Sequence, residues 1–359
     1  MIMKIREITV ANYKKFVEPL TISFCDSDGH VNDMNLILGE NGSGKTSVLQ
    51  AIVATIAPLT RPRFHAQDLD WNGFNYRYIQ SGKKPLKIEI KVDLSPVEIQ
   101  ATQSYFDRLR EMDDKMRLWI RPSQQETVSL SLDYSKMKTV ARSEEQLFQL
   151  YGYQYAKQLS QFEINPLDLF NEVGSIFWYT ENRNAFTLSS TFGENDNMAT
   201  NSFDAIRSLL TSFYYFHLDL SQGRRTLKEG QVDFYEKLDQ LYRKVFPTRH
   251  LVGAAPRFDA SVGVNETPEF FLSDGQHQYE LSEMSAGERA IFPILMDFAR
   301  YNINYSIIII DEIELHLHSP LQQALVRALP LLGTNNQFIL TSHSDNVVVM
   351  FNEDEIIRL

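Results

Sequence analysis

The stretch MNLILGENGSGKTSVLQAI, residues 34–52, decides the fold because it joins three patterns without a break. Met34–Leu38 is a short apolar run of the kind that forms a buried strand. After a glycine-rich turn, apolar residues recur at helical spacing over residues 45–57, and Pro58 would stop a helix there. The sequence therefore predicts a strand, a tight turn and a helix in immediate succession.

The turn itself, GENGSGKT, fits the pattern G-x-x-x-x-G-K-[ST] and stands between the predicted strand and helix. Its glycines allow backbone N–H groups to point inward at phosphate oxygens, and the helix N-terminus adds a favourable dipole. We expect ATP to bind here, with Lys45 against the β- and γ-phosphates and Thr46 as a ligand of Mg²⁺. The residues of this region expected to bind ATP are Gly39, Glu40, Asn41, Gly42, Ser43, Gly44, Lys45, Thr46 and Ser47.

A second pattern, IIIIDEIELHLHSP at residues 307–320, changes abruptly from four isoleucines to acids and histidines. The isoleucines predict a strand in a sheet that is covered on both faces. Asp311 would then bind the Mg²⁺ ion, and Glu312 would orient the water that attacks the γ-phosphate. His316 and His318 leave an alternative open, because they could hold a transition metal together with the acids. ATP chemistry is the favoured interpretation, since it already explains both carboxylates.

Two further motifs stand close to this strand in the sequence. LSEMSAGERA, residues 281–290, places Ser285 three residues before Glu288, which is the spacing of a helix capping box. A serine and a glycine at a helix N-terminus are also good ligands for a phosphate group. TSHS, residues 341–344, directly follows the apolar run QFIL and therefore stands at the end of another predicted buried strand.

The four motifs, in this order, resemble those of ABC-type ATPases, and MSAGE resembles the signature sequence of that family. The resemblance implies that the signature acts in trans, so that two subunits enclose two Mg·ATP molecules in a homodimer or a higher homo-oligomer. It assigns ATP binding to Ser285, Ala286, Gly287 and Glu288.

The same resemblance gives His343 a contact with the γ-phosphate, and it places His316 and His318 in a loop at the dimer interface. The expected catalytic residues are therefore Glu312, His343 and Lys45, and the expected metal ligands are Thr46 and Asp311.

Within this family the chain resembles the soluble SMC, RecF and OLD-like branch. The opening ITVANYKKF is similar to the first hairpin of RecF and OLD-like proteins, and DEIELHLHSP is similar to a form common in OLD-like ATPases. RPRFHAQDLDWNG resembles an arginine-containing loop of SMC and RecF heads, in which Arg61 and Arg63 are candidates for contacts with nucleotide or DNA. The glutamine-loop residue stays open between Gln67 and the pair Glu181 and Asn182.

Together these features predict an α/β fold: a P-loop NTPase of the ABC-ATPase head type with a mixed sheet, an antiparallel β subdomain and a helical insertion. We expect a single head over residues 1–359, with a core formed by 1–96 and 250–359 and a largely helical insertion over 97–250. No heptad pattern is long enough for an extended coiled coil. No Toprim nuclease domain is expected after His343, which favours a stand-alone ATPase head.

Bulk composition narrows the classes of function. The formal net charge of −11 argues against a protein coated in nucleic acid, although one local basic face would suffice to bind DNA. No apolar run reaches the roughly 20 residues that span a bilayer, and the opening MIMKIREITV lacks the apolar region of a signal peptide. The single cysteine, Cys25, suits a reducing cytosol. We therefore expect a cytoplasmic protein without a membrane partner.

The expected activity is slow hydrolysis of ATP, coupled to opening and closing of a dimer that controls a separately encoded effector. The resemblance to stand-alone OLD-like heads implies that this effector is a nuclease or a toxin in prokaryotic anti-phage defence. Three alternatives stay open. They are a DNA-binding RecF- or SMC-like ATPase of DNA repair or chromosome maintenance, the motor domain of a transporter, and a nuclease that uses His316 and His318 with a transition metal.

Overall fold

The computed structural model describes residues 3–60, 86–112, 119–133, 138–163, 168–180, 203–228, 231–255 and 268–359. Contacts within the chain divide it into two compact units. The first unit consists of Met1–Thr180, Ile303–Ile313 and Thr334–Leu359, and the second of Glu181–Asn302 and Glu314–Gly333. The candidates Arg61, Arg63, Gln67, Glu181 and Asn182 lie outside the described residues.

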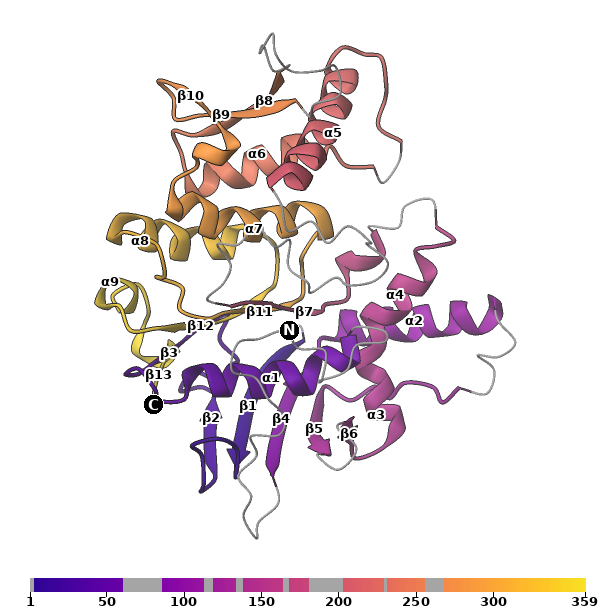
Figure 1. Cartoon of the computed structure of the whole chain (residues 1–359). Helices are drawn as coiled ribbons and strands as arrows, with labels where there is room; N and C mark the ends of the chain where they lie inside the picture. The colour runs from indigo at the N-terminus through magenta and orange to yellow at the C-terminus, as the bar shows by residue number, and fades with distance from the viewer. Residues whose placement is uncertain are drawn as a thin grey trace. The chain divides into compact units, whose positions relative to one another are not determined.

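A parallel sheet forms the centre of the first unit (Figure 1). Its strands, in spatial order, are β13 (Ile356–Arg358), β3 (Met34–Leu38), β12 (Gln337–Ser342), β11 (Ile307–Ile310) and β7 (Ile176–Tyr179). β7, β11 and β12 are buried along their whole length, as expected of apolar strands in a sheet covered on both faces. The strands predicted from the isoleucine run and from QFIL are therefore confirmed.

The helix α1 (Lys45–Thr60) lies between this sheet and a second, antiparallel one (Figure 1). The strands of the second sheet, in spatial order, are β2 (Leu20–Ser23), β1 (Lys4–Ala11), β4 (Lys87–Asp93), β5 (Thr127–Asp133) and β6 (Lys138–Ala141). Buried and exposed side chains alternate along β4 and β5, so this sheet has one apolar face, and that face packs on α1. Coverage by two sheets explains why almost every residue of α1 is buried.

The predicted end of α1 at Pro58 is wrong, because the helix continues to Thr60 with Pro58 inside it. A proline removes one N–H donor, and near the end of a helix this interrupts only a single hydrogen bond.

The other helices of the first unit belong to a side layer and to the segment after β12. α2 (Pro96–Met112) packs on α4 (Gly152–Leu159) through a small core that contains Phe106 and Tyr155. α3 (Glu144–Phe148) and 3₁₀ helices at Gln149–Tyr151 and Asp168–Asn171 complete this layer. α9 (Asp345–Val348) and a 3₁₀ helix at Glu353–Glu355 connect β12 to β13.

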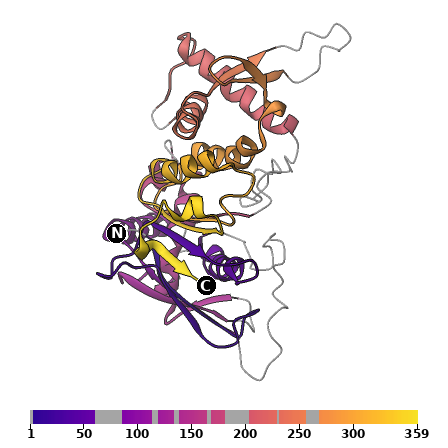
Figure 2. The ribbon, with the colours of Figure 1, turned by 90° about the vertical axis from the view of Figure 1, so that its left-hand side faces the viewer.

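Distant parts of the sequence meet at β3. This strand pairs in parallel with β12 on one side and with β13 on the other. Figure 2 shows the yellow strand β13 close to the indigo helix α1, which follows β3 in the sequence. The region after residue 334 therefore completes a sheet that begins within the first 40 residues.

The second unit combines helices with a small antiparallel sheet. Its helices are α5 (Phe203–Ser221), α6 (Phe234–Val245), α7 (Ala286–Tyr301) and α8 (Ser319–Ala328), with 3₁₀ helices at Leu281–Glu283 and Leu329–Leu331. Its strands, in spatial order, are β10 (Gln278–Glu280), β9 (Glu269–Ser273) and β8 (His250–Ala255). Residues 270–272 and 278–281, with Ser-Asp-Gly at 273–275 between them, predict a hairpin, and the antiparallel pairing of β9 with β10 confirms it. The helix that the capping-box spacing predicts after Ser285 is confirmed as well.

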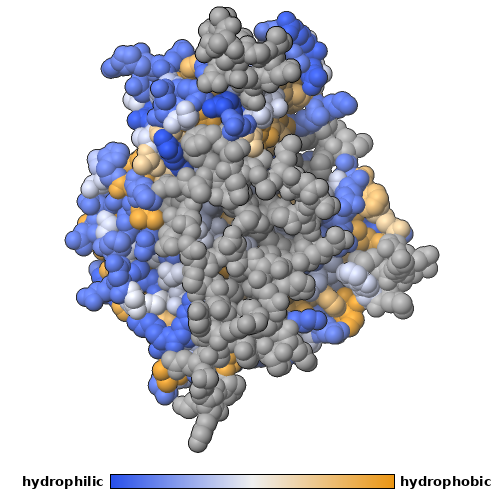
Figure 3. Space-filling view, in the orientation of Figure 1, coloured by the Kyte–Doolittle hydropathy of each residue, from blue (hydrophilic) through white to orange (hydrophobic). Residues whose placement is uncertain are grey.

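None of the helices in the described ranges combines the length and the hydrophobicity needed to cross a bilayer. Figure 3 shows hydrophilic side chains over much of α8 and of the β9–β10 hairpin. The predicted division of the chain into a core and an insertion over 97–250 stays a prediction.

Candidate nucleotide-binding site

The glycine-rich loop connects β3 to α1, in the context that its sequence predicts. Gly42 and Gly44 have φ of +79° and +103°, in the left-handed region that favours glycine. A Cβ atom on Gly44 would also lie 2.5 Å from the ring of Phe16. The curled backbone of the loop therefore depends on glycine at both positions.

Lys45 is enclosed by this loop. Its side chain is buried, and its Nζ donates to the carbonyl oxygens of Gly39 at 2.7 Å and Glu40 at 3.2 Å. The loop thus holds an ammonium group and the N-terminus of α1 in one place. Both favour the binding of phosphate groups.

Thr46 and Asp311 come together at the carboxyl edge of the parallel sheet, although 265 residues separate them in the sequence. The hydroxyl of Thr46 donates to Oδ2 of Asp311 at 2.8 Å. The hydroxyl of Thr341, at the end of β12, donates to Oδ1 of the same carboxylate at 2.5 Å. A hydroxyl and a carboxylate are oxygen ligands of the kind that Mg²⁺ prefers, so these residues fit the ion assigned to them.

Glu312 stands beside this pair in a constrained backbone conformation. Its φ is +47°, which a non-glycine residue rarely adopts, and its N–H donates to the hydroxyl of Thr341 at 2.7 Å. Thr341 therefore contacts both acids at once, through its single hydroxyl group. Sequence reasoning did not select this residue, although it begins the TSHS motif.

A pocket of about 340 Å³ in the first unit brings several of the predicted residues together. Its lining includes Lys45, Thr46 and Glu312. It also includes Lys14 and Lys15 from the turn after β1, so three lysines surround it. A chain with a formal net charge of −11 thus has a locally basic pocket at the glycine-rich loop.

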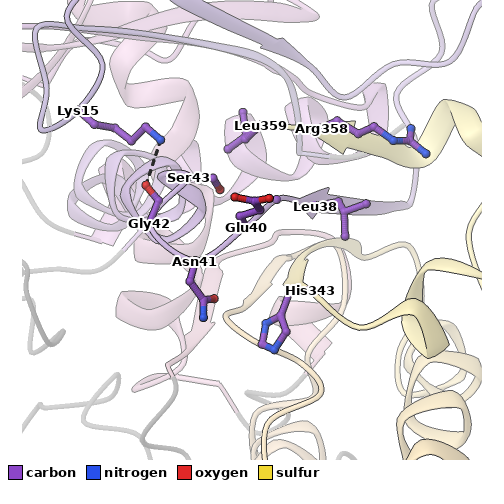
Figure 4. Close-up of a pocket in the computed structure, with 10 residues that line it drawn as sticks. Lys15, Leu38, Glu40, Asn41, Gly42, Ser43, His343, Arg358 and Leu359 are labelled. Carbon is purple, nitrogen blue, oxygen red and sulfur yellow. Dashed lines mark hydrogen bonds between the residues drawn. The ribbon is translucent and has the colours of Figure 1, made fainter.

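Lys14 and Lys15 line this pocket, although the sequence did not predict them as site residues. Nζ of Lys15 donates to the carbonyl oxygen of Gly42 at 3.0 Å (Figure 4), and Nζ of Lys14 donates to Gln50 on α1. Burial lowers the pKa of Lys14. Two adjacent lysines in the NYKKF turn are a weak signal, because only the folded chain places this turn over the loop.

A second pocket, of about 640 Å³, shares Lys15, Asn41 and Gly42 with the first. Figure 4 shows Asn41 and His343 pointing into the same space, with Arg358 of β13 farther along its wall. Its lining contains Gly39, Glu40, Asn41, Gly42, Ser43 and His343 from the predicted site. The loop that follows β12 therefore places His343 beside the glycine-rich loop.

The signature-like residues belong to the second unit. Ser285 caps α7 and forms a complete capping box with Glu288, as their spacing predicts. Ser285 and Ala286 are exposed, whereas Gly287 and Glu288 are buried. A Cβ atom on Gly287 would lie 2.6 Å from the side chain of Leu321, so glycine allows α7 and α8 to approach closely.

The two histidines of the alternative metal site, His316 and His318, are both exposed. No group of three or more histidine, cysteine, aspartate or glutamate side chains is placed to hold a metal ion among the residues that the structure describes.

Comparison with known proteins identifies relatives along nearly the whole chain. A family described as an AAA ATPase domain matches residues 3–348. The retron Vc95 probable ATPase of Vibrio cholerae serotype O1 biovar El Tor is 23% identical over 390 residues, covering 99% of this chain and 73% of that protein. The retron Ec83 probable ATPase of Escherichia coli is 22% identical over 386 residues, covering 96% of this chain and 69% of that protein.

Among solved structures, the fold is similar to that of an Smc head bound to the C-winged helix domain of ScpA. The TM-score is 0.53 at 15% sequence identity, and the match covers 99% of this chain and 93% of that chain. This similarity, together with the sheets and helices described above, confirms the predicted fold class.

Proposed function

The chain belongs to the AAA ATPase domain family, as an ABC-type ATPase of the SMC- and RecF-like branch, and we propose that it binds Mg·ATP and hydrolyses it within a dimer. The observation that carries this proposal is the hydrogen bond of 2.8 Å between Thr46 and Asp311 beside the loop that encloses Lys45. This hydrogen bond joins the two residues that we expect to bind Mg²⁺, and Thr46 is next in the sequence to Lys45, the lysine that we expect to bind phosphate.

The chemistry of the pocket suits hydrolysis of the γ-phosphate. Mg²⁺, when bound, would neutralise charge on the β- and γ-phosphates. Lys45 would bind the same phosphates, and Glu312 would orient a water molecule and accept its proton as the water oxygen bonds to the γ-phosphorus. The bond to ADP would break in line with this attack, which gives ADP and phosphate. His343 would contact the γ-phosphate from the neighbouring pocket.

Exposure of two signature-like residues supports the proposed dimer. Ser285 and Ala286 lie exposed at the N-terminus of α7, where the hydroxyl of Ser285 is bonded to Glu288 within the capping box. A helix N-terminus of this kind is suited to bind phosphate. In the proposed homodimer, or a higher homo-oligomer, Ser285 of one subunit would close over ATP that is held by Lys45 of another.

The biological role we propose is control of a separately encoded effector, a nuclease or a toxin, in anti-phage defence. Two relatives are named as probable ATPases of retrons, and the similar Smc head is described as bound to a domain of a second protein, ScpA. The names of these proteins support the proposal that this ATPase acts through a partner protein.

The decisive experiment is native mass spectrometry of a tagged Glu312→Gln variant, expressed in its own host with the neighbouring genes. Binding without hydrolysis should trap a dimer that appears only with Mg·ATP and carries a second protein. A Lys45→Ala, Glu312→Gln double variant is the matched control and should stay monomeric. If the Glu312→Gln variant remains a monomer in the presence of Mg·ATP, the proposed dimer is wrong.

The alternative role in DNA repair or chromosome maintenance gives a different result. In that case DNA, without a protein partner, would stimulate hydrolysis of ATP, and the stimulation would fall steeply as salt is added.

A further inference from the structure

A cluster of polar side chains in the second unit surrounds the carboxylate of Glu288; we call it the signature cluster. It consists of Glu288 and Ser285 at the start of α7, Tyr242 of α6, Arg249 just before β8, and Tyr279 of β10. Glu288 is only 1% exposed, so its carboxylate depends on these partners.

The carboxylate of Glu288 accepts more hydrogen bonds than it has lone-pair sites to receive them. Its Oε1 accepts from the hydroxyls of Tyr242, at 2.6 Å, and Tyr279. Its Oε2 accepts from Nη1 of Arg249 at 2.5 Å and from the N–H and the hydroxyl of Ser285 at 2.9 and 2.7 Å. These are five donors, whereas a carboxylate offers about four lone-pair sites.

The carboxylate stays ionised at neutral pH. Burial alone would raise the pKa of Glu288, but hydrogen bonds from Arg249, Tyr242, Tyr279 and Ser285 outweigh it and lower the pKa to about 2. The group is therefore an acceptor only, and it competes for the hydroxyl proton of Ser285 with any other acceptor that approaches.

A γ-phosphate is such an acceptor. Ser285 has one hydroxyl proton, and that proton now points at Glu288. To bind the γ-phosphate as a donor, Ser285 must turn this proton away from Glu288. The free energy of that change depends on how well the remaining four donors satisfy the carboxylate.

We propose that Tyr242, Arg249 and Tyr279 are positioning residues that supply enough hydrogen bonds to Glu288 without Ser285. The hydroxyl of Ser285 can then donate its hydrogen bond to the γ-phosphate of ATP in a second copy of this chain. The inference rests on the proposed dimer. If one of these donors is removed, Glu288 holds the proton of Ser285 more strongly, and the dimer forms less readily. A symmetric dimer contains two contacts between Ser285 and a γ-phosphate. One substitution therefore weakens both of them.

The test uses the Glu312→Gln background and measures two equilibria. Sedimentation velocity with Mg·ATP gives the dimer dissociation constant, and a fluorescent ATP analogue gives the nucleotide affinity of single subunits at low protein concentration. Tyr242→Phe should weaken the dimer about tenfold or more, because one hydrogen bond to a charged group is lost at each site. The nucleotide affinity of single subunits should not change.

The matched control is Tyr235→Phe. Tyr235 lies on the same helix and is also buried, but its hydroxyl donates to the carbonyl oxygen of Leu251 at 2.9 Å and not to Glu288. Both variants lose one hydroxyl from a buried tyrosine of α6, so the control shows how far a general loss of stability weakens the dimer. Tyr279→Phe is a second test at a half-buried position, where the substitution disturbs the fold less.

Arg249 provides a test of charge. Arg249→Gln should weaken the dimer, and Arg249→Lys should restore part of the loss because it keeps a cationic donor. Dimers of Tyr242→Phe, Tyr279→Phe and Arg249→Gln that are as tight as that of Tyr235→Phe would overturn the positioning role while leaving the proposed function intact. A Glu312→Gln parent that stays monomeric with Mg·ATP would overturn both.

Discussion

Replacing Thr341 with valine should separate nucleotide binding from hydrolysis. Thr341 is fully buried, and its hydroxyl both donates to Asp311 at 2.5 Å and accepts from the N–H of Glu312 at 2.7 Å. Valine has nearly the same shape as threonine, but its side chain can neither donate nor accept a hydrogen bond. The variant therefore removes two hydrogen bonds that fix the two predicted carboxylates relative to each other, and it leaves the glycine-rich loop untouched.

The size of the effect follows from these two bonds. Loss of a hydrogen bond to a carboxylate costs about 1.5–3 kcal/mol, and a half-buried N–H that loses its acceptor costs about 1–3 kcal/mol. We expect the free energy of unfolding to fall by about 2.5–6 kcal/mol. Loss of this acceptor removes one hydrogen bond that holds Glu312 at φ of +47°. A displacement of about 1 Å at a reacting group can lower the rate about a hundredfold, so kcat should fall roughly 10- to 100-fold.

The assay is phosphate release under saturating Mg·ATP, together with nucleotide binding in the absence of Mg²⁺, which should change little. Thr341→Ser keeps the hydroxyl and should retain most of the activity. Thr139→Val is the control for a buried threonine, since its hydroxyl donates to the backbone carbonyl of Thr55, away from the site, at 2.6 Å. A Thr341→Val enzyme with the kcat of Thr139→Val would refute this positioning of Asp311 and Glu312.

Three further results are expected. Lys45→Ala should abolish nucleotide binding, measured by calorimetry, because the pocket loses the ammonium group that its loop encloses; unchanged affinity would refute the site. Ser285→Arg should leave nucleotide binding by single subunits intact but block the ATP-dependent dimer in size-exclusion chromatography, and a normal dimer would show that Ser285 lies outside the interface. Burial raises the pKa of Glu98 from 4.5 to about 8, so the carboxyl ionises first in the unfolded chain. Wild type should therefore lose stability relative to Glu98→Gln as pH rises from about 4.5 to about 8, and a constant difference in urea unfolding would contradict this.

Local patterns were sufficient to predict much of the fold. The isoleucine run, QFIL and the β9–β10 turn each carry their signal within a few residues, and each forms the predicted strand or hairpin. The glycine-rich loop is equally local, because its curl requires glycine at fixed positions. Pro58 misled the prediction, since tertiary coverage of α1 outweighs one missing hydrogen bond.

Residues that meet only in the folded chain could not be predicted in the same way. Lys14 and Lys15 reach the glycine-rich loop because the turn after β1 folds over it, and no spacing in the sequence encodes that contact. The partners of Glu288 come from α6, the segment before β8, and β10, each with an ordinary local pattern. The sequence predicted the capping box of Ser285 but not the tyrosines and the arginine behind it.

The pairing of β3 with β12 and β13 has a consequence for synthesis of the chain. About 300 residues separate Leu38 from Gln337, so β3 leaves the ribosome long before its first neighbour in the sheet exists. At about 5–20 residues per second, that interval lasts roughly 15–60 s. During it the apolar run MNLIL has an unpaired edge on which another chain could add, so a chaperone should engage the nascent chain there. The glycine-rich turn that follows β3 is then among the first segments translated and among the last to acquire its final surroundings.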